Sequence, residues 1–126
     1  MRYGATHFDE LHAYWDDTLV GKIGHTADYR KLALYLKPRI DLEGWKTPGD
    51  YHQWAETWAS VSVKESHHAY QGIVFKSAEK ARNGKLKLIH IELPASYDQD
   101  QLPRAASQLV KAGVHLAYLL DSLKWE

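Results

Sequence analysis

Apolar residues recur at helical spacing along several stretches of the chain. In the first stretch, a capping pattern formed by Thr6 and Asp9 precedes the apolar residues, and Gly21 and Gly24 follow them. We therefore expect a first helix over about 7–20, whose buried side is formed by Phe8, Leu11, Trp15 and Leu19.

Two further stretches predict helices in the second quarter and at the end of the chain. One runs over about 27–37, and Pro38 ends it because the residue before a proline is kept out of the helical region. The other runs over about 99–123, with Asp98 or Asp100 as its cap, and presents one broad apolar face.

The middle of the chain predicts a helix and then an extended segment. The helix starts at the cap Thr47, and its apolar period either continues to about residue 75 or breaks near the β-branched segment 60–63. A charged run with the turn signal Asn83-Gly84 follows, and alternating residues over 86–92 predict an extended segment.

These elements indicate an all-α fold. We expect one domain over residues 1–126, built as a multi-helix bundle-like core of Trp, Leu, Val and Ala with a short extended excursion near 85–93. No internal repeat or long linker divides the chain.

Composition narrows the function classes. The chain has 126 residues and no cysteine, which excludes disulfides, thiol catalysis and thiolate metal sites. Its 16 basic residues balance its 16 acidic residues, so any binding of phosphate must be local. No apolar run approaches the ~20 residues of a membrane span, and the start of the chain does not read as a signal peptide.

One pair of residues carries the spacing of a metal site. His12 and Asp16 lie four positions apart in the first predicted helix, so their side chains lie one above the other. An imidazole and a carboxylate in that arrangement can bind one metal ion together, and the pair falls at the margin of the apolar face. No other catalytic residue is assigned from the pattern.

Three blocks, in order along the chain, resemble the S1/P1-type zinc nucleases. The first resembles the stretch in which a strand leads into the family motif Asn-Leu-His-x-x-Trp-Asp. The second resembles a helix with a Glu-Ser signature, and the third resembles the family's terminal helix. The blocks are Arg2-Tyr3-Gly4 with Leu11-His12-Ala13-Tyr14-Trp15-Asp16, Glu65-Ser66-His67 with Ala69, and Gln108-Leu109-Val110-Lys111-Ala112-Gly113-Val114-His115-Leu116-Ala117-Tyr118-Leu119-Leu120.

The resemblance implies a zinc-dependent reaction. In that family a mainly helical enzyme holds three zinc ions and hydrolyses phosphodiester bonds of single-stranded DNA and RNA. By resemblance, His12 and Asp16 are ligands of one zinc, and water activated by metal is the nucleophile. Two alternatives stay open: a zinc-dependent phospholipase C, whose branch is structurally similar, and a non-catalytic helical domain that keeps only the fold.

The same comparison predicts that the chain is the C-terminal portion of such an enzyme. The family's N-terminal tryptophan and its other His and Asp ligands have no counterpart here, and Glu10 stands where the family has asparagine. We therefore expect the missing N-terminal half as a partner, weak zinc binding and little turnover by the chain alone. The parent enzyme is expected to be exported, either periplasmic or secreted.

The remaining candidates are interpreted as structural. Adjacent His67 and His68 point about 100° apart on a helix, so they cannot both face one site. Trp54 and Trp58 have the spacing of a core stripe, although such rings also stack on bases. His115 stands where the family has arginine. A local basic run is interpreted as a solvated loop that could meet phosphate: Lys76, Lys80, Arg82, Lys85 and Lys87.

Overall fold

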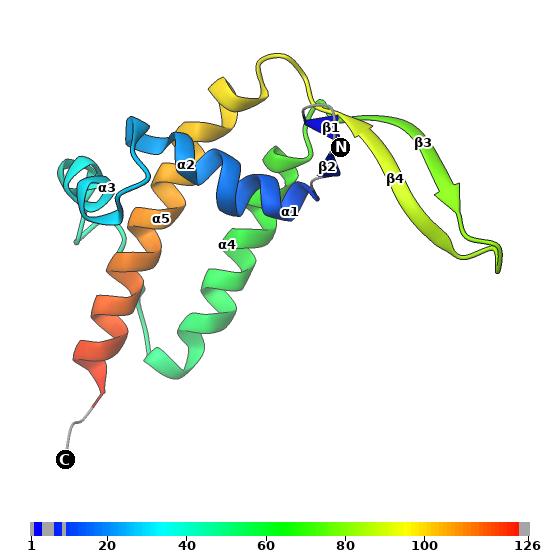
Figure 1. The fold of residues 1–126 in the computed structure, drawn as a ribbon. Coiled ribbons are helices and arrows are strands. Elements are labelled where there is room, and N and C mark those ends of the chain that lie inside the picture. The colour runs from blue at the N-terminus through cyan, green and yellow to red at the C-terminus, as the bar shows by residue number, and fades with distance from the viewer. Residues whose placement is uncertain (1, 4–6, 9, 124–126) are drawn as a thin grey trace.

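A computed structural model describes residues 2–3, 7–8 and 10–123 of the chain. Most of these residues are helical, and a two-stranded antiparallel hairpin projects from the helical body (Figure 1). The predicted all-α, bundle-like class with an extended excursion is confirmed. No helix within the described ranges is long and apolar enough for a transmembrane span.

The first helical stretch is shifted relative to its prediction. The expected first residues, His7–Phe8, form strand β2, which pairs with β1 (Arg2–Tyr3), so the helix starts only at Leu11. The predicted capping residues Thr6 and Asp9 lie outside the described residues. The stretch comprises α1 (Leu11–Ala13), a π-helical turn (Tyr14–Leu19), α2 (Val20–Lys22) and a 3-10 turn (Ile23–His25).

A glycine separates this stretch from α3 (Tyr29–Leu36). Of the two glycines predicted to stop the first helix, only Gly24 does so, with a φ of 66° that favours glycine. Asp28 then caps α3, because its carboxylate accepts a hydrogen bond from the amide of Arg30 at 2.9 Å. The helix passes into a 3-10 turn that contains the predicted stop signal, proline (Lys37–Arg39).

A 3-10 turn (Tyr51–Gln53) leads directly into the helix α4 (Trp54–Ala69). The turn is capped by Asp50, not by the predicted cap Thr47. The carboxylate of Asp50 accepts a hydrogen bond from a backbone amide of that turn at 2.8 Å. Thr47 is buried instead, and its hydroxyl accepts a hydrogen bond from the indole of Trp58 at 2.7 Å. The helix runs unbroken through its β-branched segment.

The hairpin consists of β3 (Val74–Lys80) and β4 (Leu86–Glu92). The predicted extended segment is confirmed as β4, whereas the expectation that the preceding helix continues to about residue 75 is wrong, because β3 has begun there. Gly84 has a φ of 77°, and the amide of Lys85 donates to the side chain of Asn83 at 3.0 Å. This turn reverses the chain between the strands.

The terminal helix α5 (Tyr97–Ser122) starts earlier than predicted, after Ser96. Asp98 and Asp100, the predicted caps, lie in its first turn, where carboxylates are favoured by the helix dipole. The helices α4 and α5 lie side by side in opposite directions, and the first helical stretch crosses them (Figure 1).

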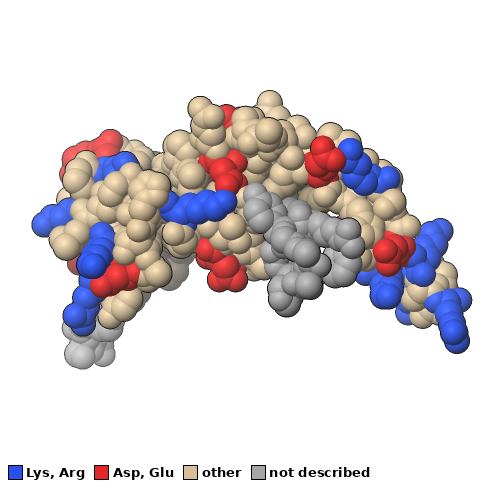
Figure 2. Space-filling model, turned by 45° about the horizontal axis from the view of Figure 1, so that its top comes forward, with Lys and Arg blue, Asp and Glu red and all other residues tan. Residues whose placement is uncertain are grey.

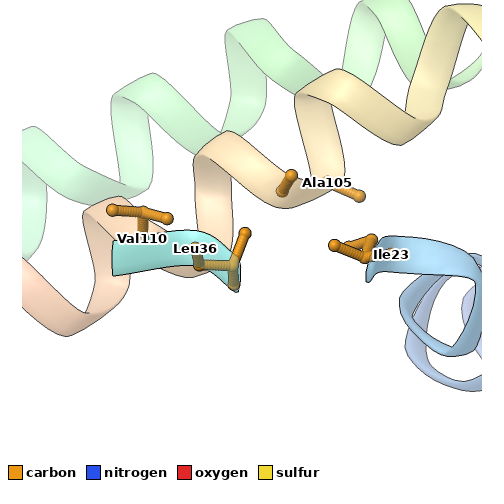
Figure 3. Packing of buried hydrophobic residues seen from close by; sticks show 5 residues of the cluster. Ile23, Leu36, Ala105 and Val110 are labelled. Carbon is orange, nitrogen blue, oxygen red and sulfur yellow. The ribbon is translucent and has the colours of Figure 1, made fainter. Parts of the chain in front are cut away.

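Buried residues form two clusters against α5. In one, Ile23 and Leu36 pack against Ala105 and Val110 of α5 (Figure 3). The other consists of the fully buried Tyr14 and Leu19 together with Tyr97. Tyr14 and Leu19 are five positions apart, and the i→i+5 hydrogen bonding of the π-helical turn places such residues on the same side. The core therefore contains tyrosine in addition to the predicted Trp, Leu, Val and Ala.

Candidate functional site

His12 and Asp16 lie one turn apart on the solvent side of the first helical stretch. His12 Nε2 and Asp16 Oδ2 are 2.9 Å apart, and the two side chains are 83% and 63% exposed. The opposite side of the same stretch carries the fully buried Tyr14 and Leu19, so the direction of the pair is fixed by the core. The helix therefore holds an imidazole and a carboxylate together where a ligand can reach them.

His12 also lines a pocket of about 360 Å³ formed by the first helical stretch, α4 and α5. The pocket joins residues from all three sequence blocks: His12 from the first, Glu65 and Ser66 from the second, and Gln108 from the third. Asp16 does not line it. Segments far apart in the sequence therefore meet at one hollow beside the His12–Asp16 pair.

A charged pair spans the wall of the pocket between α4 and α5. Arg104 Nη1 donates a hydrogen bond to Glu65 Oε2 at 3.2 Å, and each side chain is about one-third exposed. A guanidinium has five N–H donors, so the bond to Glu65 leaves donors for an anionic ligand. Next to Glu65, the hydroxyl of Ser66 donates to the carbonyl of Val63 at 2.7 Å.

The buried Tyr97 lies behind the wall of the pocket and holds one of its residues in place. The indole of Trp15, which lines the pocket, donates to the hydroxyl of Tyr97 at 2.9 Å, and that hydroxyl donates to the carbonyl of Ala69 at 2.6 Å. Burial raises the pKa of Tyr97, so its hydroxyl stays a neutral donor and acceptor. This relay connects three elements and fixes the ring of Trp15 in the pocket wall.

The His12–Asp16 pair fits part of a zinc site. Zinc accepts imidazole nitrogen and carboxylate oxygen at about 2.0–2.2 Å, so two ligand atoms of a tetrahedral ion stand about 3.3 Å apart. The observed separation of Nε2 and Oδ2 is 2.9 Å, the length of a hydrogen bond, so the two atoms would move apart by a few tenths of an ångström around an ion. Within the described ranges, no third His, Asp or Glu completes a metal-binding group with them. The pair can therefore supply two of four ligand positions.

Three other candidates from the sequence make contacts that stabilise the fold: Trp54, Trp58 and His115. Trp54 is buried, and its indole donates to the carbonyl of Pro48 at 3.2 Å. Trp58 stacks face to face on His115, with ring centroids 4.7 Å apart and planes 3° apart. His67 is exposed, whereas its neighbour His68 is half-buried.

Sequence reasoning missed Arg104, the cation of the pocket wall. Arg104 lies four positions before Gln108, so the two share a face of α5 and both line the pocket. The third sequence block starts at Gln108, and extending it by one helical turn would have included the arginine.

The sequence of the chain matches a known protein family. The sequence model of the S1/P1 Nuclease family matches residues 2–124, which is nearly the whole chain. The chain belongs to the S1/P1 nuclease family. It has no significant match among curated proteins or solved structures.

Members of the S1/P1 nuclease family depend on zinc, and their substrate is nucleic acid. The resemblance carried by the three sequence blocks is therefore confirmed. All residues of the pocket and of the His12–Asp16 pair lie within the matched range.

Proposed function

We propose that this S1/P1 nuclease family member acts in zinc-dependent hydrolysis of phosphodiester bonds in single-stranded nucleic acid, with His12 and Asp16 as two ligands of one zinc ion. The observation that carries the proposal is the exposed His12–Asp16 pair beside a pocket assembled from three family blocks. A chain of zero net charge needs such a local site to act on a polyanion.

The residues around the pair have the chemistry of this reaction. Zinc, when bound, supplies a Lewis acid for a phosphate oxygen and activates water at neutral pH. His12 and Asp16 would hold the ion through an imidazole nitrogen and a carboxylate oxygen. The guanidinium of Arg104, oriented by Glu65, offers donors to a phosphate, and the ring of Tyr70, 66% exposed at the pocket, offers a stacking surface for a base.

Two protein ligands do not complete a zinc site. We therefore place the activity in a full-length protein in which further ligands join His12 and Asp16, and we expect little turnover by this chain alone.

The test measures cleavage of single-stranded DNA by the full-length protein with zinc. His12→Ala and Asp16→Asn are each expected to lower kcat/KM by more than about 100-fold, because even the loss of an outer-shell partner of a zinc ligand costs 10–100-fold. The matched controls are His52→Ala and Asp17→Asn, which change exposed residues of the same types outside the pair.

Rates unchanged by His12→Ala and Asp16→Asn would remove these residues from the site. Cleavage of phosphatidylcholine without cleavage of single-stranded DNA would replace the nuclease assignment by a phospholipase C.

A further inference from the structure

The β3–β4 hairpin forms an arm outside the helical body. We define the basic arm as residues 74–92. All seven residues of β3 are exposed, and the hairpin projects away from the helices (Figure 1). Each strand spans seven residues, which at about 3.3 Å per residue makes the arm about 23 Å long. Burial in this molecule therefore does not explain the composition of β3, whereas Ile91 of β4 packs against the core.

The arm carries an excess of positive charge, as does a second segment over residues 30–39 that the control variant below neutralises in part. The basic arm contains five of the chain's 16 basic residues and two of its 16 acidic residues, which gives it a net charge of +3 with His neutral. The rest of the chain then carries −3. Figure 2 shows Lys and Arg gathered over the hairpin at one end of the molecule.

The acidic residues of the arm are already paired, whereas most of its cations are not. Glu92 pairs with Lys76 at 2.6 Å, and Glu79 contacts His90 at 2.9 Å. The other four cations make no ion pair within the described part of the chain: Lys80, Arg82, Lys85 and Lys87. All four lie toward the outer end of the arm: Lys80 on β3, Lys87 on β4, and Arg82 and Lys85 in the turn between the strands.

The arm starts beside the pocket. Ala69 and Tyr70, at the C-terminal end of α4, line the pocket, and β3 begins at Val74. A linear polyanion that enters the pocket can therefore continue along the arm. The turn residues Ala81–Lys85 include two cations and no large apolar side chain, but Leu86, which follows them, is 56% exposed, so the test includes a lipid surface as a competing ligand.

We propose that the basic arm binds the phosphate backbone of a single-stranded nucleic acid, outside the site of cleavage, through Lys80, Arg82, Lys85 and Lys87. The choice of this polyanion rests on the proposed function. The arm holds the strand electrostatically and without sequence preference, because cations on a projecting ribbon contact phosphates rather than base edges.

The test measures the Kd of the chain for fluorescein-labelled oligothymidylate by fluorescence anisotropy, with no zinc added, so that binding is separated from cleavage. The arm variant combines Lys80→Gln, Arg82→Gln, Lys85→Gln and Lys87→Gln. The control variant makes the same charge change on the exposed faces of α3, its following turn and α4: Arg30→Gln, Lys31→Gln, Lys37→Gln and Lys64→Gln.

Counterion release fixes the expected size of the effect. Each phosphate contact on a single strand contributes about 0.7 to the slope of log Kobs against log salt, so four contacts contribute about 2.8. The arm variant should lose a slope of about that size, which corresponds to about 50-fold in affinity between 50 and 200 mM salt. The control variant should keep most of the slope.

Equal losses in the arm and control variants would overturn the inference, as would wild-type binding by the arm variant. Self-association of the arm variant would then assign the lysines to protection of an open sheet edge. Preferential binding of phosphatidylglycerol vesicles over oligothymidylate would overturn it too. Failure of the arm variant to change binding leaves the His12 and Asp16 cleavage result intact, so the two proposals fail separately.

Discussion

At the scale of single residues, the surroundings of two histidines assign them different roles. His12 is exposed beside a carboxylate, where a metal can reach it. His115 is half-buried and stacked on Trp58. Burial lowers the pKa of His115, the charge of Lys111 lowers it further, and a hydrogen bond to the backbone of Trp45 opposes both. The neutral form of His115 is therefore more favoured in the folded chain than in the unfolded chain.

This environment predicts acid sensitivity from His115. The pKa of His115 in the folded state lies below the unfolded value of about 6.5. Between these two pKa values the unfolded state binds more protons than the folded state, so a fall in pH favours unfolding. The stabilising contribution is complete above about pH 6.5 and is lost as the pH falls through the folded pKa. Urea unfolding at several pH values should show this loss in the wild type and less of it in His115→Gln.

The same substitution at the exposed His52 serves as the control for His115→Gln. An identical dependence of unfolding free energy on pH in wild type and His115→Gln would contradict the lowering of the pKa of His115 by burial.

At the scale of elements, one carboxylate joins three of them. Asp98, in the first turn of α5, accepts hydrogen bonds from Tyr14 of the π-helical turn and from Lys22 of α2. Burial acts to raise the pKa of Asp98, but the bonds from Lys22 and Tyr14 outweigh it and hold the pKa below its ordinary value. The crossing of the first helical stretch over α5 depends on this ionised group.

Asp98→Asn should therefore destabilise the chain. Removal of the charge weakens two hydrogen bonds, at a cost of about 1–3 kcal/mol in the free energy of unfolding. Because the folded pKa of Asp98 is depressed, its contribution is complete above the unfolded value of about 3.9 and is lost as the pH falls through the folded pKa. Urea unfolding at neutral pH measures the cost.

Asp17→Asn, a change of the same kind at an exposed position, provides the comparison for Asp98→Asn. Equal unfolding free energies for the two variants would contradict the linking role of Asp98.

The elements also show what sequence pattern can predict. The long apolar face of α5 follows from its burial against two clusters, so helical periodicity finds it. The strand β3 is exposed at every position, so its sequence does not need to alternate between apolar and polar residues. Ile73, just before β3, also continues the apolar period of α4, which makes the helix look longer in the sequence than it is. The burial of Tyr14 was missed because the angles of a regular helix do not apply in a π-helical turn.

In the candidate site too, contacts within one helix could be predicted from the sequence, whereas contacts between helices could not. The contact of His12 with Asp16 follows from local helix geometry and could be predicted, although their role as ligands stays a prediction. The meeting of His12, Glu65 and Gln108 at one pocket depends on how α4 and α5 pack, which no local pattern specifies.

At the scale of the whole molecule, zero net charge conceals an uneven distribution. The basic arm carries +3 and the remainder −3, although the remainder includes a second basic segment over residues 30–39, so the salt-dependence test must separate these two candidate attractions for a polyanion. The pocket and the His12–Asp16 pair lie at the root of that arm. The export of a parent enzyme and the position of this chain as its C-terminal portion stay predictions.

The most direct test of the central claim is calorimetric titration of zinc into the chain. The wild type should bind one zinc ion weakly, and His12→Ala and Asp16→Asn should each reduce that affinity at least tenfold, by about 1.4 kcal/mol or more. The controls His52→Ala and Asp17→Asn should bind as the wild type does. Equal zinc affinity in all five proteins would contradict the assignment of His12 and Asp16 as zinc ligands.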